Sequence, residues 1–147
     1  MTSLHITPEF ALFCDTIRRE DTGKIIFVGV YTQGLAVPSF PFDAAFSVYM
    51  HGKFIGTGST NFEIRIVRQT SGEIIHSIIA RSAPLLNLAP DLKFEIMTSL
   101  LGCPVSQPET VLAQMKCEGN EWETFGSLKI SLPQPPPLSS IELFPQF

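Results

Sequence analysis

The chain has 147 residues, of which 44% are hydrophobic and only 16% are charged, and its formal net charge is −4 at pH 7. Average globular proteins carry about 25% charged residues, so we expect a protein partner or a second copy of the chain to cover part of an apolar surface. The negative charge and the scattered basic residues argue against a nucleic-acid groove, and no apolar run approaches the ~20 residues of a membrane-spanning helix.

The first predicted element is a β-hairpin between residues 10 and 31. Residues 10–17 and 25–31 are largely apolar, and the second run is rich in the β-branched and aromatic residues typical of strands. Between them the charged stretch Arg18-Arg19-Glu20-Asp21 precedes Thr22-Gly23, a pair that favours a turn. We therefore expect the charges to mark a solvated turn rather than a binding site.

The next predicted strand covers residues 44–50. It is entered through a segment with two prolines, Pro38 and Pro41, which favour an edge or a crossover over a central strand. Residues 51–60 contain three glycines and are predicted to form a loop. These glycines lack the spacing of a phosphate-binding loop, so we interpret them as turn residues.

A second hairpin is predicted over residues 60–80, where apolar residues at 62, 64 and 66 alternate with polar ones. Residues 92–101 are compatible with one helix. A strand over 92–97 followed by a loop is the preferred interpretation, because apolar residues at 92, 94 and 96 alternate with Lys93 and Glu95.

A third hairpin joins residues 110–117 to residues 122–132 through a turn that contains Gly119-Asn120. The pattern comprises seven or eight short strands with regular turns and no strong helix. It predicts an all-β protein, a single-domain antiparallel β-sandwich over residues 1–132, of the Ig-like or C2-like type.

Residues 133–147 form a proline-rich C-terminal tail, which differs in composition from the rest of the chain. Its prolines at 133 and 135–137 predict an extended polyproline stretch, a stiff arm without strand pairing. The apolar residues that follow are the candidate partner-binding residues, namely Ile141, Leu143, Phe144 and Phe147. We expect them to fold back onto the sandwich or to dock into another chain, since a free segment with four large apolar groups promotes aggregation.

The three cysteines, Cys14, Cys103 and Cys117, are odd in number and widely spaced, which predicts reduced thiols rather than a disulfide framework. Cys14 lies within an apolar strand and is expected to be buried and structural. Cys103 precedes Pro104 in a predicted loop and is the thiol expected to be more exposed, although no adjacent base marks it as a nucleophile.

No other cluster indicates a reaction or a metal. The three histidines are far apart in sequence, and the carboxylates near residues 20 and 120 are typical of solvated turns rather than of a calcium site. Asp15 is unusual in a largely apolar run. If it is buried, it must accept hydrogen bonds from backbone amides or pair with a cation, of which Arg18 is the nearest.

Residues 11–42 resemble the N-terminal signature of a widespread bacterial domain family of unknown function. The signature comprises Cys-Asp-x-x-Arg, a Gly-Lys turn, Gly-Val-Tyr and Val-Pro-x-Phe-Pro, and it is matched at Cys14, Asp15, Arg18, Gly23, Lys24, Gly29, Val30, Tyr31, Val37, Pro38, Phe40 and Pro41. Residues 115–132 resemble the final hairpin of that family. The resemblance implies a cytoplasmic bacterial sandwich and transfers no catalytic residue, and the tail lies outside it.

These observations predict a non-enzymatic binding or protein-interaction module. The alternatives are a homo-oligomeric scaffold that uses the C-terminal arm, and an enzyme or a metal- or ligand-binding protein whose site the sequence does not display. No cofactor is expected. Residues 1–10 lack the basic and apolar regions of a signal peptide, so none is expected there. The expected cytoplasmic location rests on the reduced thiols and on the resemblance.

Overall fold

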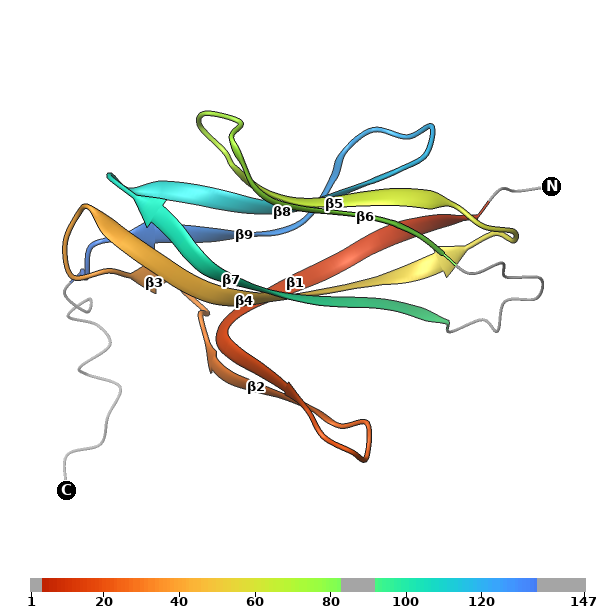
Figure 1. Cartoon of the computed structure of the whole chain (residues 1–147), viewed down its shortest axis with the longest axis horizontal. Coiled ribbons are helices and arrows are strands. Elements are labelled where there is room, and N and C mark those ends of the chain that lie inside the picture. Colours follow the sequence, from red (N-terminus) through yellow and green to blue (C-terminus); the bar gives the residue numbers. More distant parts are fainter. Residues whose placement is uncertain (1–3, 83–91, 135–147) are drawn as a thin grey trace, which may run out of the picture.

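The computed structural model describes residues 4–82 and 92–134 (Figure 1). Within them the chain forms nine strands and no helix, so no helix there is long and apolar enough to cross a membrane. In chain order the strands are β1 (His5–Arg19), β2 (Ile25–Val30), β3 (Leu35–Ala36), β4 (Phe42–Ile55), β5 (Asn61–Arg68), β6 (Ile74–Arg81), β7 (Lys93–Val105), β8 (Glu109–Cys117) and β9 (Glu123–Ser131).

The strands form two layers, as Figure 1 shows. The four-stranded sheet has the order β2-β1-β4-β7, and the five-stranded sheet has the order β3-β9-β8-β5-β6. The prediction of an all-β, two-sheet protein is confirmed. Sequence reasoning missed the two-residue strand β3, which pairs parallel to β9 and makes this sheet mixed rather than purely antiparallel.

The core lies between the two sheets and follows the alternation of the strands. The largest fully buried side chains include Phe46, Met50, Ile64 and Met115, which come from both layers. Burying a side chain of this size contributes about 1.5–3 kcal/mol to stability. The second and third predicted hairpins are therefore packed against β1, β4 and β7 through a shared apolar interior.

Two predicted loops are instead strand. Residues 51–55 continue β4, because His51 pairs with Phe10 of β1 on one side and with Glu95 of β7 on the other. Gly52 suits this crowded position, since a Cβ there would lie 2.6 Å from the carbonyl oxygen of Thr7. The strand interpretation of residues 92–97 is confirmed, but β7 runs on to Val105 through a register shift instead of ending in a loop.

Candidate interaction surface

A hairpin projects from the four-stranded sheet where β1 changes its partner. Residues 5–14 of β1 pair with β4, whereas residues 14–19 pair with β2, and Cys14 takes part in both ladders. Beyond Cys14 the strand leaves the body of the sandwich, as the orange-red ribbon at β2 in Figure 1 shows. We call residues 15–31 the projecting hairpin. A two-stranded ribbon is only marginally stable in water unless something packs against it.

Asp15 and Tyr31 connect the base of this hairpin. The phenolic oxygen of Tyr31 donates a hydrogen bond to the carboxylate of Asp15, and the amide of Tyr31 donates to the carbonyl of Phe13 at 2.8 Å. Burial, and then the hydrogen bond and the charge of Asp15, raise the pKa of Tyr31. The expected pairing of Asp15 with backbone amides or with Arg18 was conditional on burial, whereas Asp15 is exposed and accepts its hydrogen bond from Tyr31, the residue directly after β2.

Gly29 makes the contact between Asp15 and Tyr31 possible. Its φ is +68°, a backbone conformation that side chains disfavour. A Cβ at this position would lie 2.9 Å from Cγ of Asp15 and still closer to a carboxylate oxygen. Three residues of the signature, at positions 15, 29 and 31, thus meet at one point at the base of the hairpin.

The outward face of the four-stranded sheet is aromatic where the hairpin bends over it. Phe27 of β2 meets the edge of Tyr49 with ring centroids 5.0 Å apart, and Phe10 stacks on His51 at 4.8 Å. Tyr49 also donates a hydrogen bond to Glu95 at 2.7 Å. Burial, and then this bond and the charge of Glu95, raise its pKa. The aromatic contacts hold one side of the projecting hairpin against the sandwich.

His51 lies within this aromatic face and is 9% exposed. Its Nδ1 atom is 3.2 Å from the carboxylate of Glu9 but lacks the alignment of a hydrogen bond. Sequence reasoning placed His51 in a loop and missed the aromatic face. One signal was available: in residues 46–50 the even positions are all apolar and the odd positions include Tyr49, which is compatible with a strand covered on both faces.

The other side of the projecting hairpin is open. Val28 and Val30 are 44% and 40% exposed, and β2 is an edge strand without a single charged residue. Proteins normally protect such edges with charges, proline, bulges or short length, because unpaired backbone groups there accept another strand.

Two of the other three sheet edges in the described part of the chain carry such protection, and the third, β6, has one charged residue. Strand β3 has only two residues. Strand β7 contains Lys93, Glu95 and Pro104 and has a register shift, and β6 ends at Arg81 and is bonded through His76 to Thr98 of β7. Strand β2 is thus the longest edge strand without a charged residue in the described part of the chain, which makes it a candidate to accept an added strand.

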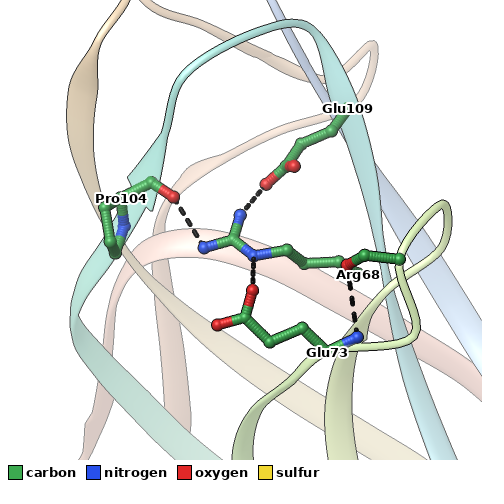
Figure 2. Close-up of polar contacts among 5 residues, drawn as sticks. Arg68, Glu73, Pro104 and Glu109 are labelled. Carbon is green, nitrogen blue, oxygen red and sulfur yellow. Dashed lines mark hydrogen bonds and ion pairs between the residues drawn. The ribbon is translucent and has the colours of Figure 1, made fainter.

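Arg68 lies at a different end of the sandwich and joins the two sheets (Figure 2). Its guanidinium donates to the carboxylates of Glu109 and Glu73, the latter at 3.1 Å, and to the carbonyl of Pro104 at 2.6 Å. Burial by itself would lower the pKa of Arg68, but the carboxylates, mainly that of Glu109, raise it. All three guanidinium nitrogens are engaged by the protein, so this cluster is a structural clamp.

Cys103 lies near this clamp and is wholly buried, contrary to the prediction of an exposed loop thiol. Its position within β7 rather than in a loop explains the difference. Cys14 and Cys117 are also buried, as expected for Cys14, and all three thiols are free. Burial is the main cause that raises the pKa of each thiol, so none has the ionised character of a nucleophile.

These raised pKa values predict a loss of stability at alkaline pH. The folded protein keeps protons on its thiols, and on Tyr31 and Tyr49, at pH values where the unfolded chain releases them. The contribution is complete below pH 9.0, the ordinary value for the thiols, and is lost as the pH rises through the folded-state values. We expect urea midpoints measured under reducing conditions to stay level from pH 8 to pH 9 and to fall steadily from pH 9 to pH 10.5.

Tyr49→Phe is the control for the alkaline effect, because it removes one of the raised phenols. Its midpoint should fall less steeply above pH 10 than that of the unaltered chain. A midpoint that stays constant up to pH 10.5 would contradict the prediction.

The tail leaves the sandwich beside the segment that follows the projecting hairpin. A hollow of about 330 Å³ lies there between residues 33–36 and residues 129–134. The candidate partner-binding residues Ile141, Leu143, Phe144 and Phe147 lie outside the described residues. No group of three His, Cys, Asp or Glu side chains in residues 4–82 and 92–134 is placed to hold a metal ion.

The chain matches no protein-family model and no curated protein sequence. The resemblance to the bacterial domain family therefore stays a prediction.

Proposed function

We propose that the protein is a non-enzymatic interaction module that binds an extended segment of a partner protein along the free edge of β2. The observation that carries this proposal is an uncharged edge strand on a hairpin that projects from the sandwich, with Val28 and Val30 exposed. An added strand would gain main-chain hydrogen bonds along β2, and the valines would supply apolar contacts.

The remaining features of the chain support a binding role over catalysis. Its three thiols are buried, and the guanidinium of Arg68 is fully engaged within the protein. Only 16% of the residues are charged, which fits a protein in which a partner covers part of the apolar surface.

Val28→Lys tests the proposed edge, since a lysine on an edge strand opposes the addition of another strand. We expect the partner proteins that the unaltered chain retains from a bacterial lysate, identified by mass spectrometry, to be lost with Val28→Lys. Ile79→Lys is the matched control, because Ile79 is 78% exposed on β6 of the other sheet. If both variants retain the same partners, β2 is not the binding edge.

A homo-oligomeric scaffold is the second candidate, because an uncharged strand such as β2 can pair antiparallel with its own copy without like-charge repulsion. Light scattering separates the two candidates. A chain that is strictly monomeric at high concentration contradicts the scaffold and leaves the interaction module intact.

We further propose that the sandwich is of the Ig-like or C2-like type and that the protein is cytoplasmic. The two packed sheets support the first point, and the free, buried thiols support the second. Three statements about the C-terminal part also remain predictions. They are the domain boundary at residue 132, the stiff proline-rich arm and the partner-binding role of the tail residues.

A further inference from the structure

We infer that residues 141–147 of the tail cover the free edge of β2 in the same molecule. The inference rests on the proposed function, in which β2 is an edge that accepts a strand. It goes further by naming a segment of this chain as the strand that occupies the edge when no partner is bound.

The position at which the tail begins favours this occupant. The described part of the tail follows β9, whose last residue, Ser131, accepts a hydrogen bond from the amide of Val37 at 2.9 Å. Residues 33–36 face residues 131–134 across the hollow described above. The tail therefore starts beside the segment that leads directly back to the end of β2.

The length of the tail is sufficient. Residues 135–141, if extended as the prolines favour, span roughly 22 Å at about 3.1 Å per residue. The backbone from Leu35 back to Val30 spans at most about 17 Å. Residues 141–147 can therefore reach β2, and these seven residues are enough to span its six.

The composition of residues 141–147 fits an edge cover. Ile141, Leu143 and Phe144 offer apolar contacts to the exposed valines of β2. Glu142 is the only charge in the segment, and the hairpin carries cations at Arg18, Arg19 and Lys24. The segment also contains Pro145, and a charge and a proline are features with which proteins close a sheet edge against further pairing. If residues 141–147 pair with β2, no further strand can be added to the sheet at that edge.

Attachment to the same chain favours pairing within one molecule. A short linker gives a tethered segment an effective concentration on the order of millimolar, far above that of a second copy in dilute solution.

A disulfide between introduced cysteines tests this arrangement in the full chain. The three native thiols are buried, so mild oxidation should join only the new pair. With Val28→Cys and Leu143→Cys together, we expect a disulfide within the monomer to form at least tenfold faster than with Ile79→Cys and Leu143→Cys. Peptide mass spectrometry identifies the bond, and gel electrophoresis separates monomer from dimer.

Equal rates for the two pairs would overturn the inference, as would a disulfide that forms mainly between molecules at micromolar concentration. Hydrogen exchange of residues 25–30 gives a second test without cysteines. Leu143→Lys should increase their exchange, and unchanged exchange would contradict the inference. If Val28→Lys abolishes partner capture while these two tests fail, the proposed function stands and only the identity of the covering strand is wrong.

Discussion

Arg68→Met is expected to lower the free energy of unfolding by about 3–5 kcal/mol, because it leaves the carboxylate of Glu109 buried without a cation. The side chains of Arg68 and Glu109 are each only 11% exposed, so water cannot replace the lost partner. Glu73, whose side chain is 65% exposed, should contribute little. Urea unfolding monitored by circular dichroism measures the change.

Two further variants show whether the loss comes from the unpaired carboxylate. Arg68→Met combined with Glu109→Met replaces the ion pair by apolar groups of similar size and should recover at least half of the lost stability. Arg81→Met removes an exposed arginine on the neighbouring strand β6 and should cost less than about 1 kcal/mol. A double variant as unstable as Arg68→Met would contradict this explanation.

The contacts of Arg68 could not be predicted from the sequence. Arg68 is the last residue of β5, Glu73 lies in the turn before β6 and Glu109 is the first residue of β8. The two carboxylates lie five and 41 positions from the arginine. No local pattern signals that Glu109 lies beside Arg68, because this contact depends on the pairing of β5 with β8 within one sheet, and the carbonyl of Pro104 is added from β7 of the other sheet. The strand pattern itself was readable, since period-two alternation around residues 62–66 depends only on neighbouring residues.

The ends of strands were predicted less well for a related reason. Gly52 and Cys103 lie in segments with residues typical of loops, yet both are within long strands. Pairing with neighbouring strands overrides local preference in a sheet, because the cross-strand hydrogen bonds and contacts decide the conformation. For Cys103 this error also reversed the expected exposure of the thiol.

The candidate interaction surface was predicted only in part. The hairpin around residues 13–31 was readable from its turn and its apolar runs, but its departure from the sandwich was not. That departure depends on β1 exchanging β4 for β2 at Cys14, which is a property of the pairing of three strands. The unusual character of Asp15 was noticed, whereas its hydrogen-bond partner, Tyr31, lies 16 positions away, directly after β2.

Gly29→Ala is expected to lower the free energy of unfolding by about 2–3 kcal/mol and to loosen the base of the projecting hairpin. An alanine with positive φ costs about 1 kcal/mol. Its Cβ would also displace the carboxylate of Asp15, which then loses the hydrogen bond from Tyr31. Urea unfolding gives the stability, and hydrogen exchange of residues 25–30 reports the loosening.

Gly23→Ala separates the two causes. Gly23 also has positive φ, +84°, but a Cβ there would meet no atom within 4 Å, so only the backbone strain of about 1 kcal/mol applies. The difference between the two variants measures the contact with Asp15. If that contact is the cause, Gly29→Ala introduced into a chain that carries Asp15→Ala should cost no more than Gly23→Ala. A cost of 2–3 kcal/mol in that background would show that the strain lies in the backbone alone and that Asp15 does not determine the geometry at the base of the hairpin.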